Sequence, residues 1–243
     1  MTMQANPTTK TCLVVSFSGM DGAGKSTQID MLCRRLKEAG LRVKLIAFWD
    51  DVARFTRMRE ATGHKIFKGD KGVGTPDAPI NRRDKNVRSW AMTCVRLGLY
   101  FADAMALRRT IRQASRSGAD FLVCDRFIYD ELANLELSNP AARAYVRLIM
   151  KLVPRPHVSY FLDADPVQAR ARKPEYPLDF LYTSRASYLA LSRLLGGITV
   201  IPPMPIPEVS RRIMEPVLEL LSRQGIVLDR INPAEDFGTP MLS

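Results

Sequence analysis

The stretch GMDGAGKST at residues 19–27 matches the complete phosphate-binding pattern G-x-x-x-x-G-K-[ST]. In such a loop the glycines let the main chain approach a phosphate, and free backbone N–H groups point at the anion. The lysine reaches the terminal phosphates, and the hydroxyl after it ligates Mg²⁺. We therefore expect the loop to bind a nucleoside triphosphate, with Mg²⁺ on Ser26, through Gly19, Asp21, Gly22, Ala23, Gly24, Lys25, Ser26 and Thr27.

The sequence predicts a strand before the loop and a helix after it, as phosphate binding by such a loop requires. Leu13 to Phe17 is a short apolar run typical of a buried strand, and the pattern from Lys25 to Glu38, closed by Gly40, predicts a helix. A loop between strand and helix holds phosphate at the helix N-terminus, where the dipole favours negative charge. The alternative, a glycine-rich turn that matches by accident, does not account for this context.

Apolar strands alternate with helical patterns along the rest of the chain. We predict a long amphipathic helix that ends near Gly118 and buries a face made of Val87, Trp90, Ala91, Cys94, Leu97, Phe101 and Met105. The remaining pattern predicts strands at 42–48, 120–124, 158–162 and 198–201, and helices at 140–152, 178–195 and 208–223. Such alternation indicates an α/β fold, a parallel sheet with helices on both faces. We predict one domain over residues 11–223, a flexible N-terminal segment at 1–10 and a C-terminal tail at 224–243.

Composition narrows the class of protein further. The chain has 243 residues, a net charge of +11 and four widely spaced cysteines. No apolar run approaches the length of a membrane span, and no hydrophobic signal region is visible, so we expect a cytoplasmic protein with reduced thiols and no membrane association. The charge alone does not choose between nucleic acid, a membrane surface and phosphorylated small molecules.

Much of the charge is local. Residues 54–88 hold ten Lys or Arg against four acidic residues. The segment has few aromatic side chains that could stack on bases, so we do not expect nucleic acid as a partner. A solvated face or lid and direct contact with a substrate phosphate both remain open for this segment.

A second polar motif, Asp125-Arg126-Phe127, follows the predicted third strand. Ligands of open parallel sheets bind at the carboxyl ends of the strands. Asp125 there can hold Mg²⁺ or orient the attacking group, and the planar guanidinium of Arg126 can bind a second phosphate. A basic residue at this place suggests transfer of a phosphoryl group to another phosphate. The alternative is a surface Asp–Arg pair that caps the next helix.

Four segments in this order resemble the thymidylate kinases, a family of nucleoside monophosphate kinases. They are the phosphate loop, Val123 to Phe127, Leu162 to Pro166 with the basic residues that follow, and the ending from Tyr188 to Val209. The resemblance implies a P-loop NTPase three-layer fold, a five-stranded parallel sheet and a short lid. It also implies ATP as phosphate donor, Mg²⁺, a nucleoside monophosphate as acceptor, and often a homodimer. The lid basic residues are Arg170, Arg172 and Lys173, of which we expect the arginines to be catalytic together with Lys25 and Asp125.

The acceptor half departs from the family pattern. Phe48 to Val52 stands where the family has an Arg-Glu-Pro turn, so Asp50 is the candidate acceptor contact there. The long helix lacks the family's arginine, with Arg108 as the nearest substitute, and Asp130 and Asn134 replace a serine and a tyrosine. Tyr100 or Phe101 is expected to stack on the acceptor base, and the pattern favours Phe101 as the core residue of the two. The resemblance favours dTMP as acceptor, bound by Arg126.

Two other classes stay open at this point. A GTPase would need an N-K-x-D motif, which the sequence lacks. A catalytically silent nucleotide-binding protein, or a kinase for a different phosphorylated acceptor, would also fit an altered acceptor half.

Overall fold

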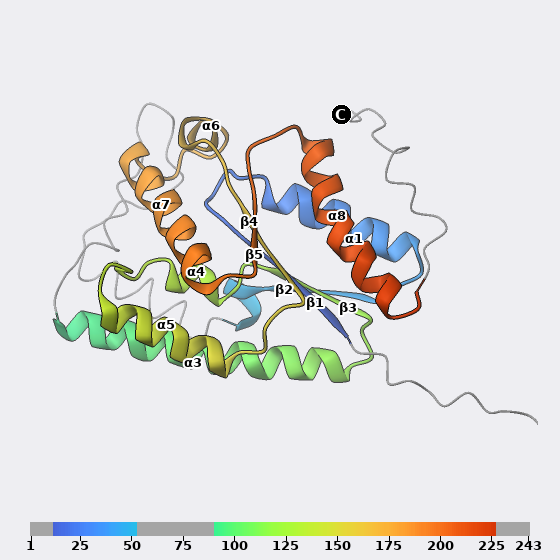
Figure 1. The fold of residues 1–243 in the computed structure, drawn as a ribbon, viewed down its shortest axis with the longest axis horizontal. Helices are drawn as coiled ribbons and strands as arrows, with labels where there is room; N and C mark the ends of the chain where they lie inside the picture. The colour runs from blue at the N-terminus through green and yellow to red at the C-terminus, as the bar shows by residue number, and fades with distance from the viewer. Residues whose placement is uncertain (1–11, 53–89, 227–243) are drawn as a thin grey trace, which may run out of the picture.

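The computed structural model describes residues 12–52 and 90–226, and its centre is one parallel sheet of five strands (Figure 1). The order across the sheet is β2-β3-β1-β4-β5, so the phosphate loop leaves the central strand. The strands are β1 (Leu13–Ser18), β2 (Val43–Ala47), β3 (Phe121–Asp125), β4 (Val158–Leu162) and β5 (Ile198–Ile201). The predicted five-stranded P-loop fold is confirmed.

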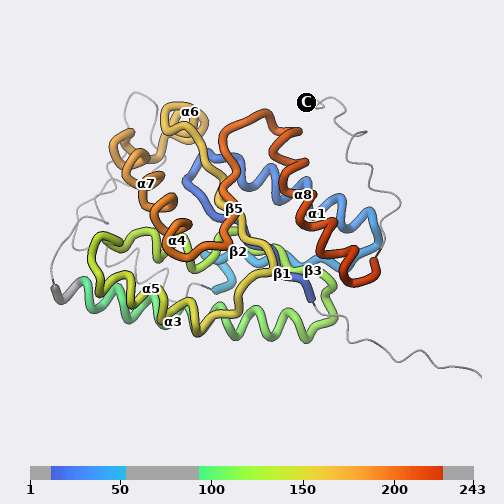
Figure 2. Tube along the Cα trace, viewed as in Figure 1, coloured from blue at the N-terminus to red at the C-terminus, as the bar shows by residue number. Residues whose placement is uncertain are grey.

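Helices cover the sheet on both faces and give three layers. The helices are α1 (Lys25–Glu38), α3 (Trp90–Arg116), α4 (Ile128–Leu132), α5 (Pro140–Leu152), α6 (Pro166–Arg172), α7 (Leu178–Leu195) and α8 (Ile206–Arg223), with a π-helical turn η1 (Phe48–Val52). Two core layers follow from strand alternation: Val15 and Phe17 of β1 pack with α1 and α8, whereas Val14 faces the layer of α3, α4, α5 and α7. Figure 2 shows α1 and α8 together on one side of the sheet and α3 beside α5 on the other.

Most element boundaries agree with the sequence-based prediction. The bounds of α1, α5, α7, β4 and β5 are those predicted, and the other strand ends differ by one residue. The last helix begins at Ile206 rather than Glu208, because a helix tolerates proline in its first turn and Pro207 stands there. The short η1, α4 and α6 were not among the predicted helices.

The buried face of α3 was predicted wrongly. Phe101 has 45% of its surface exposed and Cys94 is exposed, whereas Tyr100 is only 4% exposed and lines up with Leu107 and Ile111 in the core. Apolar residues surround the first half of this helix, so two overlapping three- and four-residue series exist there. The second half, where only one face is apolar, decides which series meets the sheet.

Some predictions fall outside the described residues. These are the basic segment at 54–88, the N-terminal segment at 1–10 and the tail beyond residue 226, and the predicted domain limits therefore stay predictions. All four cysteines have free thiols. None of the helices that the structure describes has the length and apolarity needed to cross a membrane.

Candidate functional site

The phosphate loop lies against the end of β4 and against α6, the helix that carries the predicted lid residues Arg170 and Arg172. Gly24, with φ of 83°, forms the N-cap of α1, and Gly19 and Gly22 have φ of 144° and 80°. A Cβ on Gly19 would lie 2.6 Å from the carbonyl oxygen of Leu162, and one on Gly22 would collide with the carbonyl oxygen of Ala169. The loop therefore needs glycine both for its left-handed backbone and for its close approach to β4 and α6.

Lys25 lies in this loop with its ammonium group almost fully buried. Its Nζ donates hydrogen bonds of 2.8 Å to the carbonyl oxygens of Gly19 and Met20. The pKa of Lys25 is lowered to about 8, chiefly by burial and then by the nearby Arg126, while neighbouring carboxylates oppose the shift. The loop thus holds a cation that a polyphosphate would stabilise. Ser26 and Thr27, in the first turn of α1, are exposed.

Arg126 comes from the end of β3 and reaches the phosphate loop. It is the one non-glycine residue in ranges 12–52 and 90–226 with a positive φ, 67°, and its backbone N–H donates to the oxygen of Phe17 at 2.9 Å. Its guanidinium lies between two carboxylates, donating from Nη2 to Asp21 of the loop and from Nη1 to Asp130 at 3.0 Å. Only 18% of the side chain is exposed. The alternative of a surface Asp–Arg pair is therefore wrong.

Asp130, which stands where the thymidylate kinase pattern has a serine, is a buried hydrogen-bond acceptor. Its side chain is 2% exposed and accepts hydrogen bonds from Ser18, Phe127, Tyr188 and Arg126. The sequence held one signal for this: an aspartate four residues after an arginine at the start of a helix can bind it as an i,i+4 pair.

Asp125 is half-buried at the carboxyl end of β3, directly beside Phe17, the penultimate residue of β1. Burial raises the pKa of Asp125, whereas the nearby Lys25 and Arg126 act to lower it. The structure thus brings Asp125, Lys25 and Arg126 together at one end of the sheet, as the sequence predicted for strand-end residues.

The lid residues also meet the phosphate loop. Asp165 caps α6, because its Oδ1 accepts hydrogen bonds from the backbone N–H groups of Val167 and Gln168. Arg172 at the end of α6 donates from Nη1 to the oxygen of Gly22 at 3.1 Å. Lys173 follows, with Nζ 3.9 Å from Oδ1 of Asp21. Arg170 is half-buried on the same helix.

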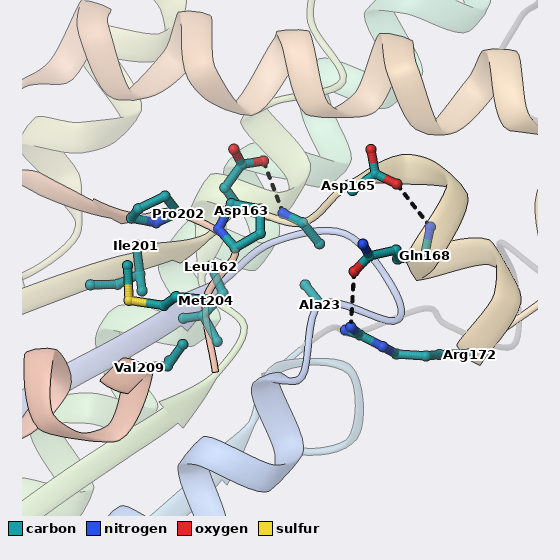
Figure 3. A pocket seen from close by; sticks show the side chains of 12 residues that line it. Ala23, Leu162, Asp163, Asp165, Gln168, Arg172, Ile201, Pro202, Met204 and Val209 are labelled. Atoms are coloured by element: carbon teal, nitrogen blue, oxygen red, sulfur yellow. Dashed lines mark hydrogen bonds between the residues drawn. The ribbon is translucent and has the colours of Figure 1, made fainter. Parts of the chain in front are cut away.

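A cavity of about 290 Å³ opens beside the loop at the carboxyl ends of β4 and β5 (Figure 3). Figure 3 shows Ala23 of the loop next to Arg172, with the chain after β5 on the opposite side. The cavity combines an apolar wall with carboxylate, amide and guanidinium groups; its lining includes Ala23, Leu162, Asp163, Asp165, Gln168, Arg172, Ile201, Pro202, Met204 and Val209.

The predicted acceptor contacts are only partly brought together. Tyr100 faces the protein interior, whereas the exposed Phe101 does not. Asp50 is exposed in η1, and its neighbour Asp51 accepts a hydrogen bond from the backbone of Ala47. Arg108, the suggested substitute for the family's arginine, instead donates to the carbonyl oxygen of Leu152 on α5.

Comparison with family models finds a match to the N-terminal quarter of the chain. The model is described as methylmalonyl Co-A mutase-associated GTPase MeaB and covers residues 1–57. This range contains the phosphate loop and the strands β1 and β2.

Curated relatives match much more of the chain. A probable thymidylate kinase of Methanosphaera stadtmanae is 26% identical over 201 residues, which is 81% of this chain and 92% of the relative. A thymidylate kinase of Symbiobacterium thermophilum is 29% identical over 185 residues, 74% of this chain and 75% of the relative.

Solved structures agree in fold. The thymidylate kinase from Candida albicans has a TM-score of 0.57 at 16% identity and covers 88% of this chain and 94% of its own. The thymidylate kinase from Ehrlichia chaffeensis has a TM-score of 0.54 at 18% identity, with 85% and 99% covered. The sequence relatives therefore point to the thymidylate kinases, and the solved structures agree with this chain in their P-loop NTPase fold.

Proposed function

We propose that this protein is a nucleoside monophosphate kinase that transfers the terminal phosphoryl group of ATP to dTMP, giving dTDP and ADP. One observation carries the proposal: the guanidinium of Arg126 binds Asp21 of the phosphate loop, so a second phosphate-binding cation lies beside the first. A donor phosphate in the loop and an acceptor phosphate at Arg126 would face each other, as in-line transfer requires. The names of the relatives support dTMP as acceptor.

The donor would lie along the loop and into the cavity beside it. The loop amides and Lys25 would hold the donor phosphates, with the nucleoside directed toward the apolar wall formed by Ile201, Pro202 and Met204. Arg172 lies between the loop and this cavity. Its guanidinium is therefore placed to stabilise the negative charge that develops on the leaving oxygen during transfer of the terminal phosphoryl group.

The oxygen donors near the loop fit Mg²⁺. Ser26 offers an exposed hydroxyl and Asp125 a carboxylate that two cations help to keep ionised. Mg²⁺ in phosphoryl-transfer sites is held by one or two protein oxygens, waters and substrate phosphates, so a small donor set is the expected one. When bound, the ion neutralises charge on the transferred phosphates.

Catalysis by the chain itself would be a matter of alignment and charge. Arg126 would fix the acceptor phosphate through its planar fork, and Lys25 would leave the carbonyl oxygens of the loop to bind the donor. Arg170, Arg172 and Lys173 would supply the positive charge that the transition state needs, because the loop itself carries aspartate and no arginine.

The test is release of ADP from ATP and Mg²⁺ with dTMP, with each other nucleoside monophosphate, and with no acceptor. We expect turnover that depends on dTMP and that Lys25→Met abolishes without unfolding the protein. Preference for another monophosphate would support kinase activity but contradict dTMP as the acceptor. Turnover without acceptor would indicate a hydrolase, and binding of ATP without any turnover would indicate a silent nucleotide-binding protein.

A further inference from the structure

The two carboxylates that bind Arg126 differ in their exposure to solvent: the side chain of Asp130 is 2% exposed and that of Asp21 is 20% exposed. Asp130 accepts from Ser18 Oγ at 2.6 Å and Phe127 N at 3.2 Å on Oδ2, and from Tyr188 Oη at 2.7 Å and Arg126 Nη1 at 3.0 Å on Oδ1. A carboxylate has about four acceptor sites, so this one is fully used. Ser18 belongs to β1, Tyr188 to α7, and Phe127 to the short connection before α4, so three parts of the fold hold Asp130 independently of Arg126.

Asp21 is more exposed than Asp130 and lies next to a second cation. It lies on the phosphate loop with 20% of its side chain exposed, and the same Oδ1 that binds Arg126 is 3.9 Å from Nζ of Lys173. Lys173 is exposed and follows the lid helix. Lys173 can therefore serve as the cation for Asp21 when Arg126 binds another anion.

We propose that Asp130 is the positioning residue that anchors Arg126, and that Asp21 is an exchangeable partner whose place the acceptor phosphate takes. This inference rests on the proposed function. With the site empty, two carboxylates neutralise the guanidinium and keep it between them. With acceptor present, Nη2 exchanges Asp21 for a phosphate oxygen while Nη1 stays on Asp130. The thymidylate kinase pattern has a serine at the place of Asp130, so this anchor is a departure of the present chain.

Tyr188 extends the anchor to the lid side of the molecule. Its hydroxyl donates to Asp130, and its ring stacks on Phe161 of β4 with centroids 4.9 Å apart and an interplanar angle of 11°. Tyr188 lies on α7, the helix that follows the lid helix in the chain. Removing its hydroxyl would loosen Asp130 without changing any charge in the site.

The test compares Asp21→Asn with Asp130→Asn. Each variant removes one negative charge beside Arg126, so charge alone predicts the same effect on anion binding in both. Removing either negative charge near Arg126 should favour anion binding if charge alone matters. The probe is inorganic sulfate, titrated by NMR with the phosphate loop occupied by a non-hydrolysable ATP analogue and Mg²⁺. We expect Asp21→Asn to tighten sulfate binding roughly threefold or more, because a competitor is removed, and Asp130→Asn to weaken it roughly fivefold or more, because the guanidinium loses its anchor.

Equal tightening in both variants would overturn the anchor role of Asp130, and weakening in Asp21→Asn would overturn the exchange. Asp120→Asn is the matched control: Asp120 also binds an arginine, Arg42, but immediately before the opposite end of β3, and sulfate binding should stay at the wild-type value. If Asp130→Asn does not fold, Tyr188→Phe decides. It should weaken sulfate about twofold or more, whereas Tyr160→Phe, which loses a hydroxyl bonded to the Ile213 oxygen, should not.

Kinetics then separate this inference from the proposed function. In Tyr188→Phe the KM for the monophosphate should rise while the KM for ATP and kcat change little, because the donor side is untouched. An equal loss in kcat would show a general structural role and overturn the inference. The sulfate titration needs no turnover, so absence of transfer in the wild type would reject the proposed function and leave the anchor to be judged by the titration.

Discussion

Binding of ATP should be accompanied by uptake of a proton on Lys25. The free protein holds this side chain with a pKa of about 8, chiefly because the ammonium group is buried. A polyphosphate favours the charged form, and we expect it to return the pKa toward 10.5, the value of an unperturbed lysine. Deprotonated Lys25 must therefore gain a proton when the nucleotide binds.

The size of the effect follows from these two pKa values. At pH 8.5 about three-quarters of Lys25 is neutral in the free protein and about 1% in the complex, so about 0.75 proton is taken up per ATP. At pH 7 the same calculation gives about 0.1 proton. The apparent affinity for ATP should fall as pH rises above 8, by up to about tenfold per pH unit until the pKa of the complex is reached.

Isothermal titration calorimetry measures this uptake directly. The binding enthalpy is measured at pH 8.5 in two buffers of different ionisation enthalpy, and the difference gives the number of protons. The phosphates of ATP are already deprotonated at this pH, because their pKa is near 6. Lys25→Met should show no buffer dependence and much weaker binding. A wild-type enthalpy that is independent of buffer at pH 8.5, or the same uptake in Lys25→Met, would refute the reasoning.

Three further outcomes are expected. Arg172→Ala should lower kcat by about 10²-fold with a smaller effect on ATP binding, as steady-state kinetics would show; near-normal kcat would place the missing transition-state charge elsewhere. Arg126→Lys should raise the KM for the monophosphate far more than the KM for ATP, because lysine lacks the planar fork; equal changes would contradict its assignment to the acceptor. Gly22→Ala should lower the free energy of unfolding, measured in urea, more than Gly40→Ala does. Both glycines have a left-handed backbone (φ of 80° and 78°), but only Gly22 lies against Ala169. Equal losses of about 1–2 kcal/mol in the two variants would show that the contact with Ala169 adds nothing.

The part of the candidate site formed by the phosphate loop could be predicted from the sequence because it is local. The phosphate loop is contiguous, and the strand and helix on either side have clear periods, so the positions of Gly24, Lys25 and Ser26 follow directly. Arg126 could be placed near the loop because the carboxyl ends of neighbouring parallel strands meet. The partner of its guanidinium could not, since Asp21 lies 105 residues away in the chain.

The part of the candidate site around Arg126 and Asp130 was less predictable because it depends on tertiary contacts. The sequence holds an i,i+4 signal for the pair of Asp130 with Arg126, but the burial of Asp130 follows from the packing of Ser18 and Tyr188 around it. In the same way, Tyr100 and Phe101 are adjacent apolar residues, and the register of α3 on the sheet determines which one is buried.

The most direct test of the account follows the phosphoryl group itself. ATP labelled on its terminal phosphate is incubated with Mg²⁺ and dTMP, and the products are separated and counted. The account predicts that labelled dTDP and ADP form in equal amounts and that Lys25→Met forms no labelled dTDP. Arg126→Lys should approach the wild-type rate only at high concentrations of dTMP. Label that appears solely as inorganic phosphate, or a rate of transfer that is the same in wild type and Lys25→Met, would contradict it.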